Sequence, residues 1–205
     1  MENNNQSRDI FIKELPETST EPASLGLFGL AVAALTLGVT YMGLADGTDN
    51  ALLIPWVLFF GATTQFVAGL KEFKRSNIFG ATVFTFFSMA MYSIALNAFI
   101  NTFTEVPVDI NHYVAGLIGV FIFLLIATVA SMMTNKVLFS IVVVVDIALP
   151  FLVAYYLWDV VYSPEIAGIF LLITSALSFY AAAAVLLNTM AGKEVLPLGS
   201  PIWSP

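Results

Sequence analysis

One acidic residue of this chain stands inside a long apolar segment, and it is the first candidate for chemistry. Asp146 interrupts the segment VLFSIVVVVDIALPFLVAYYLW, residues 137–158. A carboxylate near mid-membrane is costly, so it must face protein or water or take up a proton. Pro150 cannot donate to the carbonyl of Asp146, which favours a local helix distortion. Two interpretations stay open: a proton-binding or gating residue, or a structural acid paired with a Tyr, Gln or Thr of a neighbouring helix.

Small and polar residues recur at four-residue spacing in a second apolar segment. Gly61, Gln65 and Gly69 would lie on one face of a helix. Small residues there permit close helix packing, and we expect Gln65 to bond across that contact. A pore-lining Gln65 is the alternative.

Hydroxyl side chains mark a third segment. Thr82, Thr85 and Ser88 lie roughly along one helix face. Such hydroxyls either line a polar path or bond back to their own helix. His112 precedes the next apolar segment with no second His beside it, so we interpret it as an interfacial residue and not as a ligand.

The composition excludes several classes of protein. The 205 residues contain no Cys and one His, so thiol catalysis and Cys-ligated metals are excluded, and neither a metal site nor a cofactor is expected. The net charge of −7 argues against binding to nucleic acid. No clustered His or paired carboxylates occur within the apolar segments, so we do not expect an enzyme.

Six apolar segments organise the chain. The sequence is 59% hydrophobic and 10% charged, with mean hydropathy +0.91, too apolar for a soluble surface. Each segment has about the 20 residues that a helix needs to cross a bilayer, and none alternates as barrel strands do. The prediction is an all-α integral membrane protein with six transmembrane helices at Leu25–Ala45, Ala51–Leu70, Ile78–Ile100, Tyr113–Met133, Val137–Trp158 and Ile166–Leu187.

The charges predict the orientation. With six spans, all seven basic residues fall on one side: Arg8, Lys13, Lys71, Lys74, Arg75, Lys136 and Lys193. The positive-inside rule then places both termini in the cytoplasm. We expect a multi-pass protein of the cell membrane, plasma or inner. We divide the chain into a flexible N-terminal tail (1–20), a transmembrane domain (21–190) and a C-terminal tail (191–205).

The first apolar segment opens with a short motif, Glu21-Pro22-Ala23-Ser24-Leu25-Gly26-Leu27. Pro22 and Ser24 suit a helix start, with Ser24 as the N-cap. A helix start at the cytoplasmic mouth is a ready position for an anion, although Glu21 beside it counts against a permanent one.

This motif resembles the Asn-Pro-Ala-Pro-Leu-Gly-Leu signature of the acetate uptake transporters, with five of seven positions identical. Other segments resemble that family in order and spacing: Gln65-Phe66-Val67-Ala68-Gly69-Leu70, Glu72-Phe73-Lys74, Asn77-Ile78-Phe79-Gly80, Tyr180, Leu187-Asn188 and Val195-Leu196-Pro197-Leu198-Gly199. The resemblance covers residues 21–199. It implies a six-helix protomer in a homo-hexamer, with one path per protomer for acetate or, in some members, succinate.

The resemblance also implies site residues. A hydrophobic constriction falls on Leu30, Phe87 and Val145. Candidates for a polar path or proton site are Asp146, Gln65, Thr82, Thr85, Ser88 and Tyr180. Because no basic residue lies within the spans, we expect weak substrate binding, either channel-like or proton-coupled. The alternatives are a pore for a neutral solute such as ammonia, or a non-transporting membrane sensor or assembly protein.

Overall fold

The structure is a computed structural model that describes residues 20–45 and 51–204. Within these ranges, six helical segments are long and apolar enough to cross a membrane, which confirms the predicted all-α architecture. Except for Thr20, the predicted N-terminal tail lies outside the described residues. The spans are α2 (Ala23–Tyr41), a composite span of α3 (Leu53–Pro55), a π-helix (Trp56–Thr64) and α4 (Gln65–Lys74), then α5 (Ile78–Phe103), α6 (Ile110–Ser131), α7 (Lys136–Trp158) and α8 (Ser163–Ala191).

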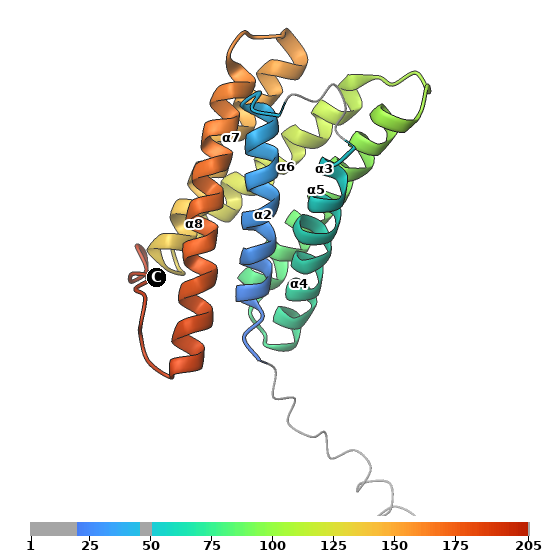
Figure 1. Ribbon diagram of the computed structural model, residues 1–205. Coiled ribbons are helices and arrows are strands. Elements are labelled where there is room, and N and C mark those ends of the chain that lie inside the picture. Colours follow the sequence, from blue (N-terminus) through green and yellow to red (C-terminus); the bar gives the residue numbers. More distant parts are fainter. Residues whose placement is uncertain (1–19, 46–50, 205) are drawn as a thin grey trace, which may run out of the picture.

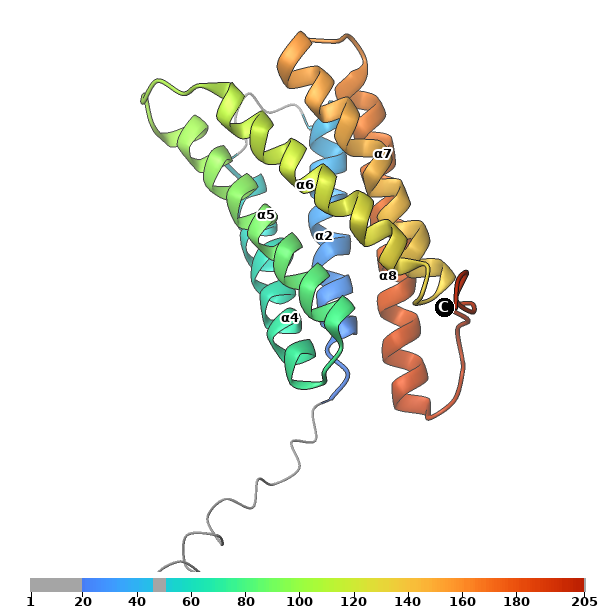
Figure 2. The ribbon, with the colours of Figure 1, turned by 180° about the vertical axis from the view of Figure 1, so that it is seen from behind.

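Successive spans run in alternating directions, so the helix ends gather at two ends of the bundle (Figure 1 and Figure 2). These two ends differ in charge. The basic end holds the starts of α2, α5 and α7, and its described basic residues are Lys71, Lys74, Arg75, Lys136 and Lys193. The acidic end holds Glu105, Asp109, Asp159 and Glu165, and no Lys or Arg among the residues described. The gathering of basic residues at one end is as predicted; that this end faces the cytoplasm stays a prediction.

Polar residues between the predicted apolar segments form the N-caps of three helices. Asn77, Asp109 and Asn135 precede α5, α6 and α7, and a side-chain oxygen of each accepts a hydrogen bond from a backbone N–H of the first turn. These bonds satisfy N–H groups that have no partner within the helix. The short polar breaks therefore both end one span and begin the next.

The start of α2 differs from the predicted one. The helix begins at Ala23 with Pro22 at the N-cap position, so the prediction of Ser24 as the N-cap is wrong. The side chain of Glu21 partners the helix start instead, and its Oε1 accepts a hydrogen bond from the Ala23 backbone N–H at 3.3 Å. Its Oε2 lies 2.6 Å from Nη2 of Arg75. The protein's own carboxylate thus occupies the anion position at this helix start.

The second span contains an element that the sequence does not predict, the π-helix Trp56–Thr64. Around it, the expected close packing of small residues is present. A Cβ atom at Gly61 would lie 2.8 Å from Ala33 on α2, and one at Gly69 would lie 2.3 Å from Thr85 on α5. The second span is therefore held closely between α2 and α5.

The most extensive helix packing joins α2 to α8 at the centre of the bundle. A Cβ atom at Gly168 would lie 2.8 Å from the backbone N of Met42 and 3.0 Å from the carbonyl oxygen of Gly38. Two turns further along α8, Ser175 donates a hydrogen bond to the carbonyl of Ala31 at 2.8 Å. The two backbones approach so closely because glycine occupies the contact.

Gly168→Ala is therefore expected to lower the free energy of unfolding by about 1–3 kcal/mol, because the added methyl group meets backbone atoms. The matched control is Gly119→Ala on α6, where nothing lies within 4 Å of an added Cβ. There alanine's helix propensity should stabilise by up to about 1 kcal/mol. Thermal unfolding in detergent measures both variants, and equal shifts would contradict this packing.

Candidate functional site

Three cavities follow one another from the acidic end of the bundle toward the basic end. The acidic-end cavity has a volume of about 370 Å³, the middle cavity about 280 Å³ and the basic-end cavity about 80 Å³. The middle and basic-end cavities share Phe87 as a wall. The acidic-end and middle cavities share more of their walls, namely Leu37, Tyr41, Ile94, Asn97, His112 and Tyr113.

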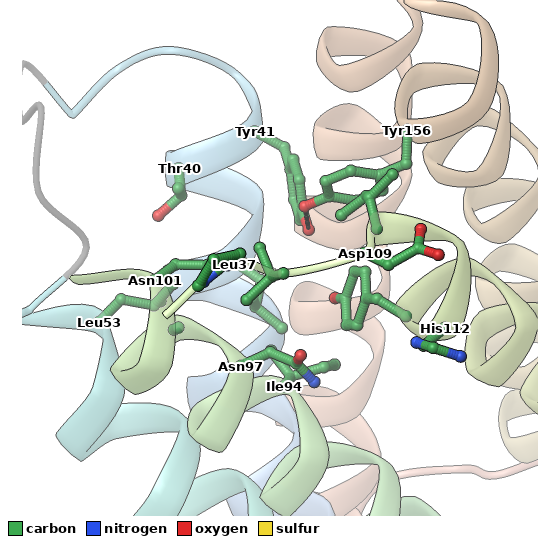
Figure 3. A pocket seen from close by; sticks show the side chains of 15 residues that line it. Leu37, Thr40, Tyr41, Leu53, Ile94, Asn97, Asn101, Asp109, His112 and Tyr156 are labelled. Carbon is green, nitrogen blue, oxygen red and sulfur yellow. Dashed lines mark hydrogen bonds between the residues drawn. The ribbon is translucent and has the colours of Figure 1, made fainter. Parts of the chain in front are cut away.

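Three tyrosines from three helices form a polar wall of the acidic-end cavity (Figure 3). The hydroxyl groups of Tyr41 on α2 and Tyr156 on α7 face one another at 3.0 Å. The ring of Tyr113 on α6 packs edge-on against Tyr156, with ring centroids 5.2 Å apart. Asn97 and Asn101 of α5 add amide groups. Neutral hydroxyl and amide donors of this kind bind the oxygens of an anion more weakly than a fixed cation does.

One carboxylate and the single histidine also line this cavity. Asp109 accepts hydrogen bonds from the backbone N–H and the side-chain amide of Asn111 at 2.9 and 2.8 Å. These bonds, the backbone one foremost, hold the pKa of Asp109 below its usual range. His112 lines both the acidic-end and the middle cavity, so the residue that the sequence indicates as interfacial is also a cavity residue.

The three residues of the implied constriction lie around the boundary between the middle and basic-end cavities. Val145 lines the middle cavity, Leu30 lines the basic-end cavity and Phe87 lines both. Their exposed fractions are 5–6%, so they face the interior and not lipid. An apolar boundary of this kind holds water weakly and can act as a gate. Their role as the constriction stays a prediction.

Two buried polar side chains of α4, Gln65 and Glu72, line the basic-end cavity. Nε2 of Gln65 donates to the carbonyl oxygen of Gly61 at 2.8 Å. The prediction that Gln65 bonds across a helix contact is therefore wrong, because its amide folds back along its own helix. Glu72 receives a hydrogen bond from Nδ2 of Asn77 at 2.9 Å.

Asp146 lies apart from this series. It is not among the residues that line the three cavities, although its neighbour Val145 is. Oγ1 of Thr128 on α6 donates to its Oδ2 at 2.5 Å. This is the paired arrangement with a threonine of a neighbouring helix, one of the two interpretations left open by the sequence. The helix α7 continues through Pro150 beside it.

The hydroxyl face predicted on α5 does not form a polar path. Thr82 is exposed on the outside of the bundle, and Thr85 packs against Gly69 of α4. Ser88 is fully buried, but it is not a lining residue of the three cavities. The three positions turn apart because a spacing of three residues drifts around a helix of 3.6 residues per turn.

Tyr180 holds the C-terminal segment and is not a lining residue of the three cavities, so its place in a polar path stays a prediction. Its hydroxyl donates to the carbonyl of Pro197 at 2.8 Å. Further along, the backbone N–H of Ile202 donates to the carbonyl of Met132 at 2.9 Å. Residues after α8 therefore fold back along the basic end to the junction of α6 and α7 (Figure 2).

Glu72 and the cavity tyrosines are site residues that the sequence does not predict. Glu72 lies between the predicted second and third apolar segments, whereas α4 continues to Lys74. A usable pattern was present, because Gln65 and Glu72 are seven residues, or two helical turns, apart and so share a face. The tyrosines lie near span ends and are brought together only by tertiary packing.

The fold and its cavities define a class: a multi-pass membrane protein with a series of interior spaces running from one end of a six-helix bundle toward the other. Comparison with known proteins gives the family. The model of the GPR1/FUN34/yaaH family matches residues 9–197, and the chain belongs to this family.

Several relatives are transport proteins. The succinate-acetate/proton symporter SatP of Escherichia coli (strain K12) is 27% identical over 191 residues, which cover 87% of this chain and 94% of that protein. Acetate permease A of Emericella nidulans is 25% identical over 200 residues, covering 90% of this chain and 67% of the permease. The glyoxylate pathway regulator of Yarrowia lipolytica is 30% identical over 124 residues; this match covers 58% of the chain and 46% of the regulator.

The fold is also that of a solved transport protein. The structure of the bacterial acetate channel SatP matches with a TM-score of 0.80 at 25% identity, covering 88% of this chain and 99% of the channel. The symporter, the permease and the channel are transport proteins and not enzymes.

Proposed function

We propose that this protein moves acetate, a related small monocarboxylate or succinate across the cell membrane. The observation that carries the proposal is the series of three adjoining cavities inside one chain. Acetate appears in the names of the symporter, the permease and the channel, which supports the substrate class. Under the positive-inside rule the basic end, with both termini, faces the cytoplasm.

The chemistry of the walls suits weak binding and easy release. A carboxylate entering at the acidic end meets the hydroxyls of Tyr41, Tyr113 and Tyr156 and the amides of Asn97 and Asn101. These groups replace part of its hydration shell as it dehydrates. It then passes from the middle to the basic-end cavity between Leu30, Phe87 and Val145, which form the neck. The lining residues of the middle cavity include no Lys or Arg, so the carboxylate binds there only weakly.

Each protomer contains a path of its own under this proposal. The cavities lie inside the helix bundle of one chain. In the homo-hexamer that the family resemblance implies, each of the protomers therefore has its own path, and the path does not depend on assembly. The many exposed apolar residues on the outside of the bundle suit lipid or a neighbouring protomer.

Uptake of labelled acetate into proteoliposomes tests the function. We expect an initial rate well above that of empty liposomes, and competition from other short monocarboxylates. Uptake no greater than in empty liposomes contradicts the proposal. Such a failure together with ammonia permeation would favour the neutral-solute pore, and a failure with both solutes would favour a non-transporting role.

A further inference from the structure

Glu72 is buried although it lies near the end of a spanning segment. Its side chain is 1% exposed and lines the basic-end cavity. Oε2 accepts the hydrogen bond from Asn77, but Oε1 is buried with no hydrogen-bond partner in the described structure. Leaving a carboxylate oxygen buried and unpaired is costly. This oxygen therefore indicates a proton or a ligand.

The charges around Glu72 do not balance when it is ionised. Nε of Arg75 lies 4.0 Å from its Oε2, while Nη2 of the same guanidinium lies 2.6 Å from Oε2 of Glu21. Lys71 and Lys74 on α4 are exposed, and the lining residues from α5, α7 and α8 are uncharged. Among the residues that the structure describes, one guanidinium thus faces two carboxylates. The group is negative with Glu72 ionised and neutral with Glu72 protonated.

The second polar group of the cavity adds another acceptor. Gln65 uses Nε2 on its own helix, and its Oε1 is buried without a partner among the described residues. The free polar atoms of Gln65 and Glu72 are therefore both acceptors when Glu72 is ionised. A carboxylate guest also offers only acceptors. A carboxylate oxygen of the guest can therefore contact Oε1 of Glu72 only when a hydrogen is shared between them.

We propose that Glu72 is the proton-binding group of the basic-end cavity, and that a carboxylate occupies this cavity only together with one proton. The inference rests on the proposed function and deepens it. In one form Glu72 carries the proton and donates its O–H to the guest's carboxylate. In the other, the proton has moved to the guest, and the neutral acid donates its O–H to Oε1 of Glu72. Either way one proton accompanies one carboxylate, and no other bond changes.

Space and placement support this role. The cavity volume of about 80 Å³ is several times the roughly 10–15 Å³ that one water needs, so a guest of a few heavy atoms fits. Phe87 lines both this cavity and the middle cavity, so a guest that passes the neck enters the cavity that Glu72 lines. Asp146 also has one oxygen, Oδ1, buried without a partner among the described residues, and its Oδ2 accepts a hydrogen bond from Thr128, but it is not a lining residue of the three cavities.

Replacement of Glu72 by its neutral isostere tests the inference. In proteoliposomes, acidifying the outside should raise the initial rate of acetate uptake by the wild type, after subtraction of the rate in empty liposomes. Glu72→Gln should remove this stimulation while acetate–acetate exchange without a gradient continues. The matched control Asp146→Asn should keep it. If the wild type transports acetate and Glu72→Gln retains the full stimulation, the inference is overturned while the proposed function stands.

A second measurement needs neither a variant nor flux. A hydrophobic carbodiimide reacts with protonated carboxyl groups in apolar surroundings, and mass spectrometry locates the adduct. In the wild-type protein we expect labelling of Glu72, slowed severalfold by acetate but not by chloride, whereas any labelling of Asp146 should be unaffected by acetate. Failure to label Glu72 at any acidity at which the protein stays folded, or labelling that acetate does not slow, would overturn the inference even if transport itself were absent.

Discussion

Phe87→Ala is expected to let larger monocarboxylates through the neck. Phe87 is the one lining residue that the middle and basic-end cavities have in common. Removing its ring joins spaces of about 280 and 80 Å³, so a longer acid such as butyrate no longer has to displace an aromatic side chain. A barrier lowered by about 1.4 kcal/mol raises the butyrate rate roughly tenfold. The measurement is the ratio of butyrate to acetate uptake in proteoliposomes.

The matched control is the neighbouring phenylalanine. Phe86 is 37% exposed and stacks on Phe123 with ring centroids 3.8 Å apart, away from the three cavities. Phe86→Ala should leave the uptake ratio unchanged. Truncation of a buried Phe typically costs about 3–5 kcal/mol of stability, so thermal unfolding in detergent must accompany the comparison. An unchanged ratio in folded Phe87→Ala protein would show that this ring does not limit passage.

The six spans could be predicted because lipid leaves few alternatives to an apolar helix of about 20 residues. The predicted ends of the spans were less accurate than their number, because a helix can continue through polar residues beyond the apolar segment. The second span ends at Lys74, four residues beyond the predicted Leu70, and this extension turns Glu72 inward. The π-helix Trp56–Thr64 has no counterpart in the apolar pattern, because π and α segments need the same kinds of residue.

The site was only partly accessible from sequence. Leu30, Phe87 and Val145 came from the family resemblance, and they lie around one boundary in the structure. Hydropathy draws attention to Asp146 because it is surrounded by apolar residues in sequence. Burial is set by tertiary packing, which places Thr128 against Asp146 and turns Glu72, flanked by charged residues in sequence, into the basic-end cavity.

The second large effect concerns a thiol placed in the path. The natural chain has no cysteine, so a single introduced one is the only target for a thiol reagent. Val145→Cys removes little volume from the wall of the middle cavity. Reaction with sulfonatoethyl methanethiosulfonate then adds a charged group to that wall through a mixed disulfide. A bulky anion fixed beside the neck should obstruct acetate sterically and by repulsion, and dithiothreitol should restore the flux.

Ile147→Cys is the matched control, two residues along the same helix. Ile147 is 39% exposed on the outer surface, and it is not a lining residue of the three cavities. The reagent should leave its acetate flux unchanged whether or not the thiol reacts. A third variant, Asn97→Cys, reports whether the reagent enters from the acidic end, because Asn97 lines both the acidic-end and the middle cavity.

The most direct test of an interior path is therefore the acetate flux of Val145→Cys proteoliposomes before and after this reagent, with mass spectrometry to count the adduct. A path past Val145 predicts that flux falls by roughly tenfold or more, equivalent to a barrier at least about 1.4 kcal/mol higher, and that reduction reverses the loss. Unchanged flux through protein in which Val145→Cys is fully modified would contradict the path.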